Sequence, residues 1–215
     1  KTSLMESKVV FFWFRRDLRL EDNVGLSNAL KSGLKVIPIF IFDEEILDRL
    51  PTDDARVTFI YKTLSNLDKQ LKAKSTSLLI KKGKPIDVWK TIVSEFNIDS
   101  VYTNLDYEPY ALKRDKEIEG FLTTKNIQFL NFKDQVIFEE NDVVKNDGLP
   151  YTVFTPYKNK WLQKIDRLKD TKDYIIDFSK FHQFTAVFPS LENIGFTKSA
   201  INVKPFNLEF LHNYD

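Results

Sequence analysis

Charged side chains follow several short apolar runs of this sequence, in positions where they could bind a ligand. Arg15 and Arg16 come after the first run, Asp43 comes after the second, and Asp106 and Glu108 come after the fourth. Paired carboxylates could act as an acid and a base, but at strand ends they more often hold a ligand or an arginine. We therefore expect a binding edge here; solvated turns or mutual ion pairs are the simpler alternative.

Residue types that other catalytic sites need are scarce. The chain of 215 residues has no cysteine, which excludes thiol nucleophiles and cysteine zinc sites and favours a cytoplasmic setting. Its two histidines, His182 and His212, lack metal-ligand spacing and an obvious serine partner. Its six glycines form neither a dinucleotide-binding nor a Walker motif. We expect no catalytic residue and no metal in this chain.

The overall charge and hydropathy limit the classes of partner that this chain is expected to bind. With 32 basic and 31 acidic residues the net charge is +1, so there is no bulk electrostatic attraction to nucleic acid or to a membrane surface. No apolar run reaches the roughly eighteen residues of a membrane span, and the N-terminus does not resemble a signal peptide. The 19 phenylalanines fit a large core or a pocket for a flat ligand.

The charged groups need elements that bring them together, and the sequence predicts such elements. The expected strands are residues 8–14, 35–43, 76–83, 99–106 and 126–133. Several of these runs lack polar alternation, as strands buried on both faces do. Helical spacing of apolar residues runs through 53–71 and 85–96. A further helix begins near Val24, with Asp22 or Asn23 as its cap.

Alternation of strands and helices predicts an α/β fold. We expect a Rossmann-like five-stranded parallel sheet with helices on both faces, formed by residues 1–133. Ligands bind such sheets outside the carboxyl ends of the strands, where the strand order reverses. The charges that follow the strands would then lie on one edge of the molecule.

The alternation ends near residue 133. Residues 134–169 contain a turn and a helix with Trp161 on its apolar stripe, and we expect them to complete the α/β domain. Residues 170–215 show no sustained period and are interrupted by prolines and a glycine. Such a segment is typical of an irregular interdomain connector, either a linker or a segment that packs on something else.

Several motifs, taken in order, resemble the N-terminal domain of DNA photolyases and cryptochromes. The stretch FFWFRRDLRLEDN, from Phe11 to Asn23, resembles the opening signature of that family. It is followed, in family order and spacing, by FIFDEEIL (40–47), DDARVTFIYKTLSNL (53–67), NLDYEPYALKRD (104–115) and GLPYTVFTPYKNKW (148–161). The set is most similar to class I bacterial deoxyribodipyrimidine photolyases.

The resemblance implies a function for the parent protein. Such photolyases use blue or near-UV light to split cyclobutane pyrimidine dimers in DNA, and their N-terminal domain can hold a light-harvesting pigment. It also implies that FAD and damaged DNA are bound by a C-terminal helical domain beyond these 215 residues, so that this chain alone is catalytically inactive. Trp13, Trp89 and Trp161 would then be core residues. The alternatives are the regulatory domain of a sensory cryptochrome and a freestanding Rossmann-like nucleotide-binding or interaction module.

The resemblance also implies a pigment pocket. The segment DYEPY is similar to the deazaflavin-binding form, whereas folate-binding members carry Asn-Glu where this chain has Tyr110 and Ala111. A deazaflavin or FMN is therefore expected rather than a folate, and an empty cleft is the alternative. The matching positions are Arg16, Phe40, Asp43, Arg56, Asp106 and Glu108. Asp17, Arg19 and Asp22 are expected to brace the turn and cap the helix, while Arg15 could face the pigment or the helical domain.

Overall fold

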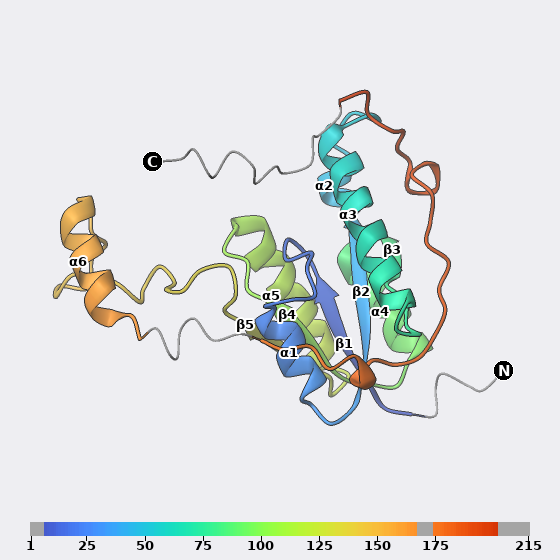
Figure 1. Ribbon diagram of the computed structural model, residues 1–215, viewed down its shortest axis with the longest axis horizontal. Helices are drawn as coiled ribbons and strands as arrows, with labels where there is room; N and C mark the ends of the chain where they lie inside the picture. Colours follow the sequence, from blue (N-terminus) through green and yellow to red (C-terminus); the bar gives the residue numbers. More distant parts are fainter. Residues whose placement is uncertain (1–6, 167–173, 202–215) are drawn as a thin grey trace.

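The five predicted strands form one parallel sheet at the centre of the structure (Figure 1). The computed structural model describes residues 7–166 and 174–201. The strands are β1 (Val9–Phe14), β2 (Lys35–Asp43), β3 (Leu79–Gly83), β4 (Ile98–Asn104) and β5 (Gln128–Phe132). They pair in parallel in the order β3-β2-β1-β4-β5, which confirms the predicted sheet. The order reverses between β1 and β4, so a ligand crevice is expected at the carboxyl ends of these strands.

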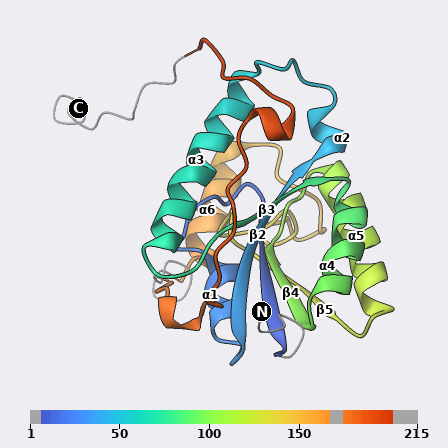
Figure 2. The same cartoon turned by 90° about the vertical axis from the view of Figure 1, so that its right-hand side faces the viewer.

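Helices cover both faces of the sheet, as predicted (Figure 2). One face carries α1 (Val24–Leu30) and α3 (Ala55–Lys72), and the other carries α4 (Pro85–Glu95) and α5 (Pro109–Thr123). Alternate residues of β1 point to opposite faces: Phe12 and Phe14 join the α1–α3 core, while Phe11 and Trp13 join the α4–α5 core. Burying each such ring contributes roughly 1.5–3 kcal/mol to stability. The apolar run that precedes the charged stretch is therefore the centre of both cores.

The three tryptophans do not share one environment. Trp13 and Trp89 are buried and meet edge to face at 5.7 Å, which confirms their prediction as core residues. The prediction for Trp161 is wrong, because this residue is only half-buried, against the edge of Phe138 at 5.4 Å. It lies on α6 (Phe154–Lys164), which buries none of its side chains and sits to one side of the sheet (Figure 1). The helix itself was predicted, but its apolar side chains are not buried, and the ring contact of Trp161 is with a loop residue.

Residues 174–201, which we call the strap, run back along the domain between α3 and the sheet edge (Figure 2). The His182 amide donates to the Val36 carbonyl at 2.9 Å, at the start of β2. Four strap side chains join the α1–α3 core: Phe181, Leu191, Ile194 and Phe196. The described part of the irregular segment therefore packs on its own domain, and its role as an interdomain connector stays a prediction. The rest of the connector, with His212, lies outside the described residues.

The strap also explains why β3 begins three residues later than predicted. Thr76 Oγ1 donates to the His182 carbonyl at 2.8 Å, and Ser77 Oγ accepts the Ala186 amide at 3.1 Å. These two side chains tie the chain to the strap, and regular pairing with β2 begins at Leu79. A strand-like composition could not reveal this contact, because its partner lies more than a hundred residues further along the chain.

Replacing Tyr61 with phenylalanine should lower the free energy of unfolding by about 0.5–1.5 kcal/mol. The Tyr61 hydroxyl on α3 donates to the Pro189 carbonyl of the strap at 2.9 Å, and the variant loses only this bond. Urea unfolding of the chain measures the loss. Tyr107→Phe, at an exposed tyrosine, is the matched control and should change stability by less than about 0.5 kcal/mol. Equal losses in the two variants would show that the bond does not anchor the strap.

Candidate functional site

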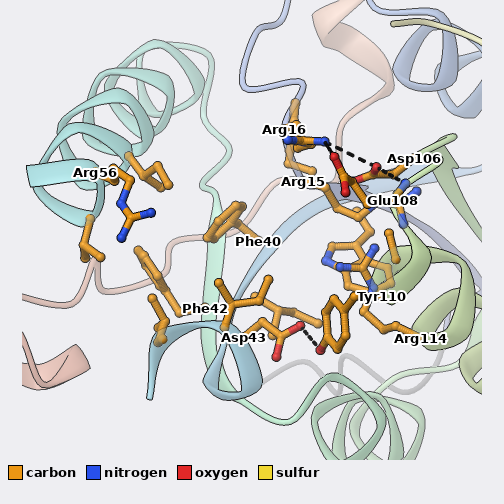
Figure 3. A pocket seen from close by; sticks show the side chains of 18 of the residues that line it. Arg15, Arg16, Phe40, Phe42, Asp43, Arg56, Asp106, Glu108, Tyr110 and Arg114 are labelled. Atoms are coloured by element: carbon orange, nitrogen blue, oxygen red, sulfur yellow. Dashed lines mark hydrogen bonds and ion pairs between the residues drawn. The ribbon is translucent and has the colours of Figure 1, made fainter. Parts of the chain in front are cut away.

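A cavity of about 480 Å³ opens at the carboxyl edge of the sheet (Figure 3). Its volume lies within the range of roughly 300–1,000 Å³ that is usual for small-molecule sites. The ends of β1 and β2, the start of α3 and the junction of β4 with α5 line it. All six residues that the sequence singled out contribute to the lining: Arg16, Phe40, Asp43, Arg56, Asp106 and Glu108. The structure thus brings them together, while their contact with a pigment stays a prediction.

The middle of the cavity is apolar. Phe40 on β2 is nearly buried and packs edge to face with Phe42 at 5.0 Å between ring centroids. Trp13 and Ile41 line the cavity from the opposite core, and Ile46 lines it from the short helix α2 (Glu44–Leu47). Aromatic rings fixed in this way give a flat aromatic ligand an apolar surface to pack on.

One end of the cavity carries a loose group of charges from β1 and β4. Arg16 Nη1 lies 3.5 Å from Asp106 Oδ1 and 3.6 Å from Glu108 Oε1. The side chains of Arg16 and Glu108 are each 56% exposed, whereas that of Asp106 is 8% exposed and also accepts the Glu108 amide at 3.1 Å. The Arg16–Glu108 pair is exposed on both sides and contributes about 0–1 kcal/mol, so a ligand can replace it at small cost.

Asp43 stands at the other end of the cavity and binds Tyr110, a residue that the sequence did not single out as a ligand. The Tyr110 hydroxyl donates to Asp43 Oδ2 at 2.6 Å, and the Asp43 carboxylate caps α2 by accepting the Glu45 amide at 3.0 Å. Burial raises the pKa of Asp43, although the Tyr110 bond opposes the shift. Burial, reinforced by the bond to Asp43, also raises the pKa of Tyr110 above its ordinary value. The Tyr110 phenol thus keeps its proton at neutral pH and donates it to the hydrogen bond with Asp43.

Arg56 lies on the α3 side of the cavity, across from Glu108 (Figure 3). Its guanidinium makes two hydrogen bonds to Asp54, at 3.0 and 2.7 Å, and Asp54 also caps α3 through the Arg56 amide. The hydrogen bonds from Arg56 lower the pKa of Asp54 to about 2. The Arg56 side chain is 71% exposed, so the cavity reaches solvent beside a fixed cation.

Arg15, whose role the sequence left open, points into the domain and pairs with α5. Its guanidinium donates to the Asp115 carboxylate and to the Asn104 carbonyl. Arg114, also missed by the sequence reasoning, donates to Asp115 Oδ1 from two nitrogens, at 3.1 and 3.0 Å. Both guanidinium groups lie over the Trp13 ring, at 5.3 and 4.9 Å from its centroid. Burial lowers the pKa of Arg15, with Asp115 opposing the shift. This buried group fixes the wall between β1 and α5.

Two of the remaining charges of the opening motif, Asp17 and Arg19, brace the turn after β1 with their side chains, as expected, whereas Asp22 takes part through its backbone carbonyl. Asp17 accepts the Arg15 amide at 2.8 Å, and Arg19 Nη2 donates to the Asp22 carbonyl at 2.6 Å and to Asp134 at 2.9 Å. Of the two candidate caps, Asn23 is the one that closes α1, because its side chain accepts the Leu26 amide at 3.0 Å. The charged stretch therefore divides into a structural group and one residue, Arg16, that faces the cavity mouth.

The cavity lies at the reversal point of a parallel sheet, which is where α/β domains of this kind commonly bind small molecules. Within residues 7–166 and 174–201, no helix is long and apolar enough to cross a membrane, and no cluster of histidine or acidic side chains could hold a metal ion. The family model described as DNA photolyase matches residues 10–174. The chain belongs to the DNA photolyase family, and it is related to the N-terminal domain of photolyases and cryptochromes.

Named relatives and a solved structure agree with this assignment. A deoxyribodipyrimidine photo-lyase from Synechococcus is 30% identical over 87% of this chain, which spans 40% of the length of that relative. A cryptochrome-1 from Anopheles gambiae is 29% identical over 66% of this chain, and the match covers 28% of the length of that relative. The crystal structure of an archaeal photolyase from Sulfolobus tokodaii is described as holding two FAD molecules, with the implication of a novel light-harvesting cofactor, and is 31% identical with a TM-score of 0.62. That comparison covers 72% of this chain and 34% of the archaeal one.

Proposed function

We propose that this chain is the light-harvesting domain of a deoxyribodipyrimidine photolyase and that its cavity binds a flavin-type pigment. The observation that carries the proposal is the convergence of the six predicted residues, from separate β–α junctions and α3, on one cavity of about 480 Å³. The names of the Synechococcus and Sulfolobus relatives support it. When bound, the pigment would absorb light and pass the excitation energy to a second chromophore.

The lining fits a flavin-type ring better than a folate. Phe40 offers an apolar surface, and Arg16, Asp106 and Glu108 offer a donor and acceptors at one end. A pterin ring would need a carboxylate where this chain has Ala111, which is buried and cannot accept a hydrogen bond. Donors left unpaired in this way cost about 1–3 kcal/mol each. We therefore propose a deazaflavin or FMN as the ligand.

The activity of the parent protein is part of the same proposal. A helical domain of the parent would hold FAD, bind damaged DNA and split the pyrimidine dimer, and this chain alone would show no repair. The relative named cryptochrome-1 makes a sensory parent the second candidate. A dimer-repair assay on the parent under blue light separates the two, because repair is the defining reaction of the photolyase alone.

Titration with FMN and with a deazaflavin should change the absorbance and fluorescence of the ligand, whereas a methenyl-folate should bind more weakly. Replacing Asp106 and Glu108 together with alanine should weaken binding about tenfold or more, because each replacement removes a hydrogen-bond acceptor at the cavity. Asp99→Ala is the control, since Asp99 lies at the opposite end of β4 and pairs with Lys8. Absence of binding by every ligand, or equal binding by the double variant, would contradict the proposed site.

A further inference from the structure

The hydrogen bond between Asp43 and Tyr110 joins two β–α junctions that lie 67 residues apart in the sequence. Asp43 ends β2, and Tyr110 lies in the first turn of α5. Asp43 Oδ2 accepts the Tyr110 hydroxyl at 2.6 Å, and Oδ1 accepts the Glu45 amide at 3.0 Å. Asp43 is buried, and each of its oxygens already has a donor from the protein.

The Tyr110 ring is held in place on its other side. The Arg114 guanidinium lies 5.7 Å from the centroid of the Tyr110 ring and 4.9 Å from that of Trp13. Arg114 is in turn fixed by its hydrogen bonds to Asp115. A side chain locked by packing and by hydrogen bonds keeps one position when a ligand enters. Tyr110 is thus organised to face Asp43 in the absence of any ligand.

The opposite end of the cavity differs in its free hydrogen-bonding capacity (Figure 3). Asp106 Oδ1 accepts the Glu108 amide, while its second oxygen accepts no hydrogen bond from the described part of the chain. The Glu108 carboxylate is exposed and lies 3.6 Å from Arg16. Acceptors that remain open toward the cavity are therefore found beside Arg16 and not beside Tyr110.

We infer that Tyr110 is a positioning residue whose hydroxyl braces Asp43, so that a ligand finds its hydrogen-bond acceptors at Asp106 and Glu108 and not at Asp43. The inference rests on the proposed function and changes the predicted role of Asp43 from a ligand contact to one half of an internal brace. It fits a flat aromatic ligand that buries an apolar edge beside Phe40 and offers its donors at the Asp106–Glu108 end.

The test is a double-mutant cycle on FMN affinity, measured by fluorescence titration of the 215-residue chain. Tyr110→Phe and Asp43→Ala should each weaken binding about fivefold to tenfold, the scale of one lost hydrogen bond. The double variant should bind about as well as either single variant, because both changes remove the same brace. Tyr107→Phe, at the exposed tyrosine of the same junction, should leave the affinity within about twofold of wild type.

Asp43→Asn separates a brace from a direct ligand contact. In asparagine the amide oxygen can keep the bond from the Glu45 amide, and the NH2 group can donate to the Tyr110 hydroxyl oxygen, so this variant should recover most of the affinity that Asp43→Ala loses. A loss in Asp43→Asn equal to that in Asp43→Ala, or a further loss in the double variant, would show that the carboxylate contacts the ligand and would overturn the inference.

Wild-type binding with no change in Tyr110→Phe would also overturn it while leaving the proposed function standing. If wild type binds neither FMN nor a deazaflavin, the proposed function itself fails. Urea unfolding of each variant confirms that the folded state is being titrated.

Discussion

Replacing Asp115 with alanine should lower the free energy of unfolding by about 3–5 kcal/mol, the cost of removing one partner from a buried ion pair. Asp115 lies on α5 and forms ion pairs with Arg15 at the end of β1 and with Arg114 on its own helix. The three side chains are each 10% exposed or less, so water cannot replace the lost carboxylate. The variant leaves two buried guanidinium groups without their shared acceptor.

Urea unfolding followed by circular dichroism measures this loss. The control is Asp87→Ala, which removes an acid from an exposed pair with Lys90 at 3.0 Å and should change stability by less than about 1 kcal/mol. Asp115→Asn gives a second measurement, because it keeps the shape of the side chain and one acceptor while it removes the charge. A loss of under 1 kcal/mol in Asp115→Ala would mean that Arg15 and Arg114 find other partners, and that this wall of the cavity is not fixed by charge.

The sequence predicted the sheet well because its signal is local. Each strand buried on both faces is a continuous apolar run, and the helices between them repeat their apolar residues every three or four positions. The short helix α2 could not be predicted in this way, since four residues are too few to show a period. The error at Trp161 has a different origin. Its apolar stripe is a local pattern, but burial also requires a second layer, which residues far away in the sequence must supply.

The sequence predicted which residues line the cavity better than it predicted which of them contact one another. The rule that polar groups after parallel strands meet at one edge was enough to bring Arg16, Asp43 and Glu108 together. Which charge pairs with which cannot be read from spacing, because Arg15 and Asp115 are 100 residues apart. Tyr110 gave no signal as a ligand: in sequence it is a tyrosine after the proline that starts a helix, and only the fold shows that it reaches Asp43.

The polar centre behind the site explains the second large effect that we expect. Asn104, at the end of β4, donates from Nδ2 to Asp17 at 2.5 Å and to the Asn23 side chain at 2.9 Å, and its Oδ1 accepts the Gly25 amide at 2.8 Å. These bonds join β4, the turn after β1 and the first turn of α1, so they fix the junctions from which Arg16 and Asp106 project. Every polar atom of the Asn104 side-chain amide is used on protein partners.

Replacing Gly25 with alanine should therefore destabilise the chain by about 2–5 kcal/mol, the sum of overpacking and a strained buried hydrogen bond. A Cβ atom at this position would lie 2.6 Å from Asn104 Oδ1 and 2.9 Å from the Phe12 ring, and neither buried group has room to move. Gly120→Ala on α5 is the matched control, because its Cβ would meet nothing within 4 Å. The free energy of unfolding of that variant should rise by about 0.4–1 kcal/mol, because alanine lowers the conformational entropy of the unfolded chain. The urea midpoints of the two variants should thus shift in opposite directions. A stabilised Gly25→Ala variant would show that α1 can move away from Asn104. The junctions behind the cavity would then not be fixed by this contact.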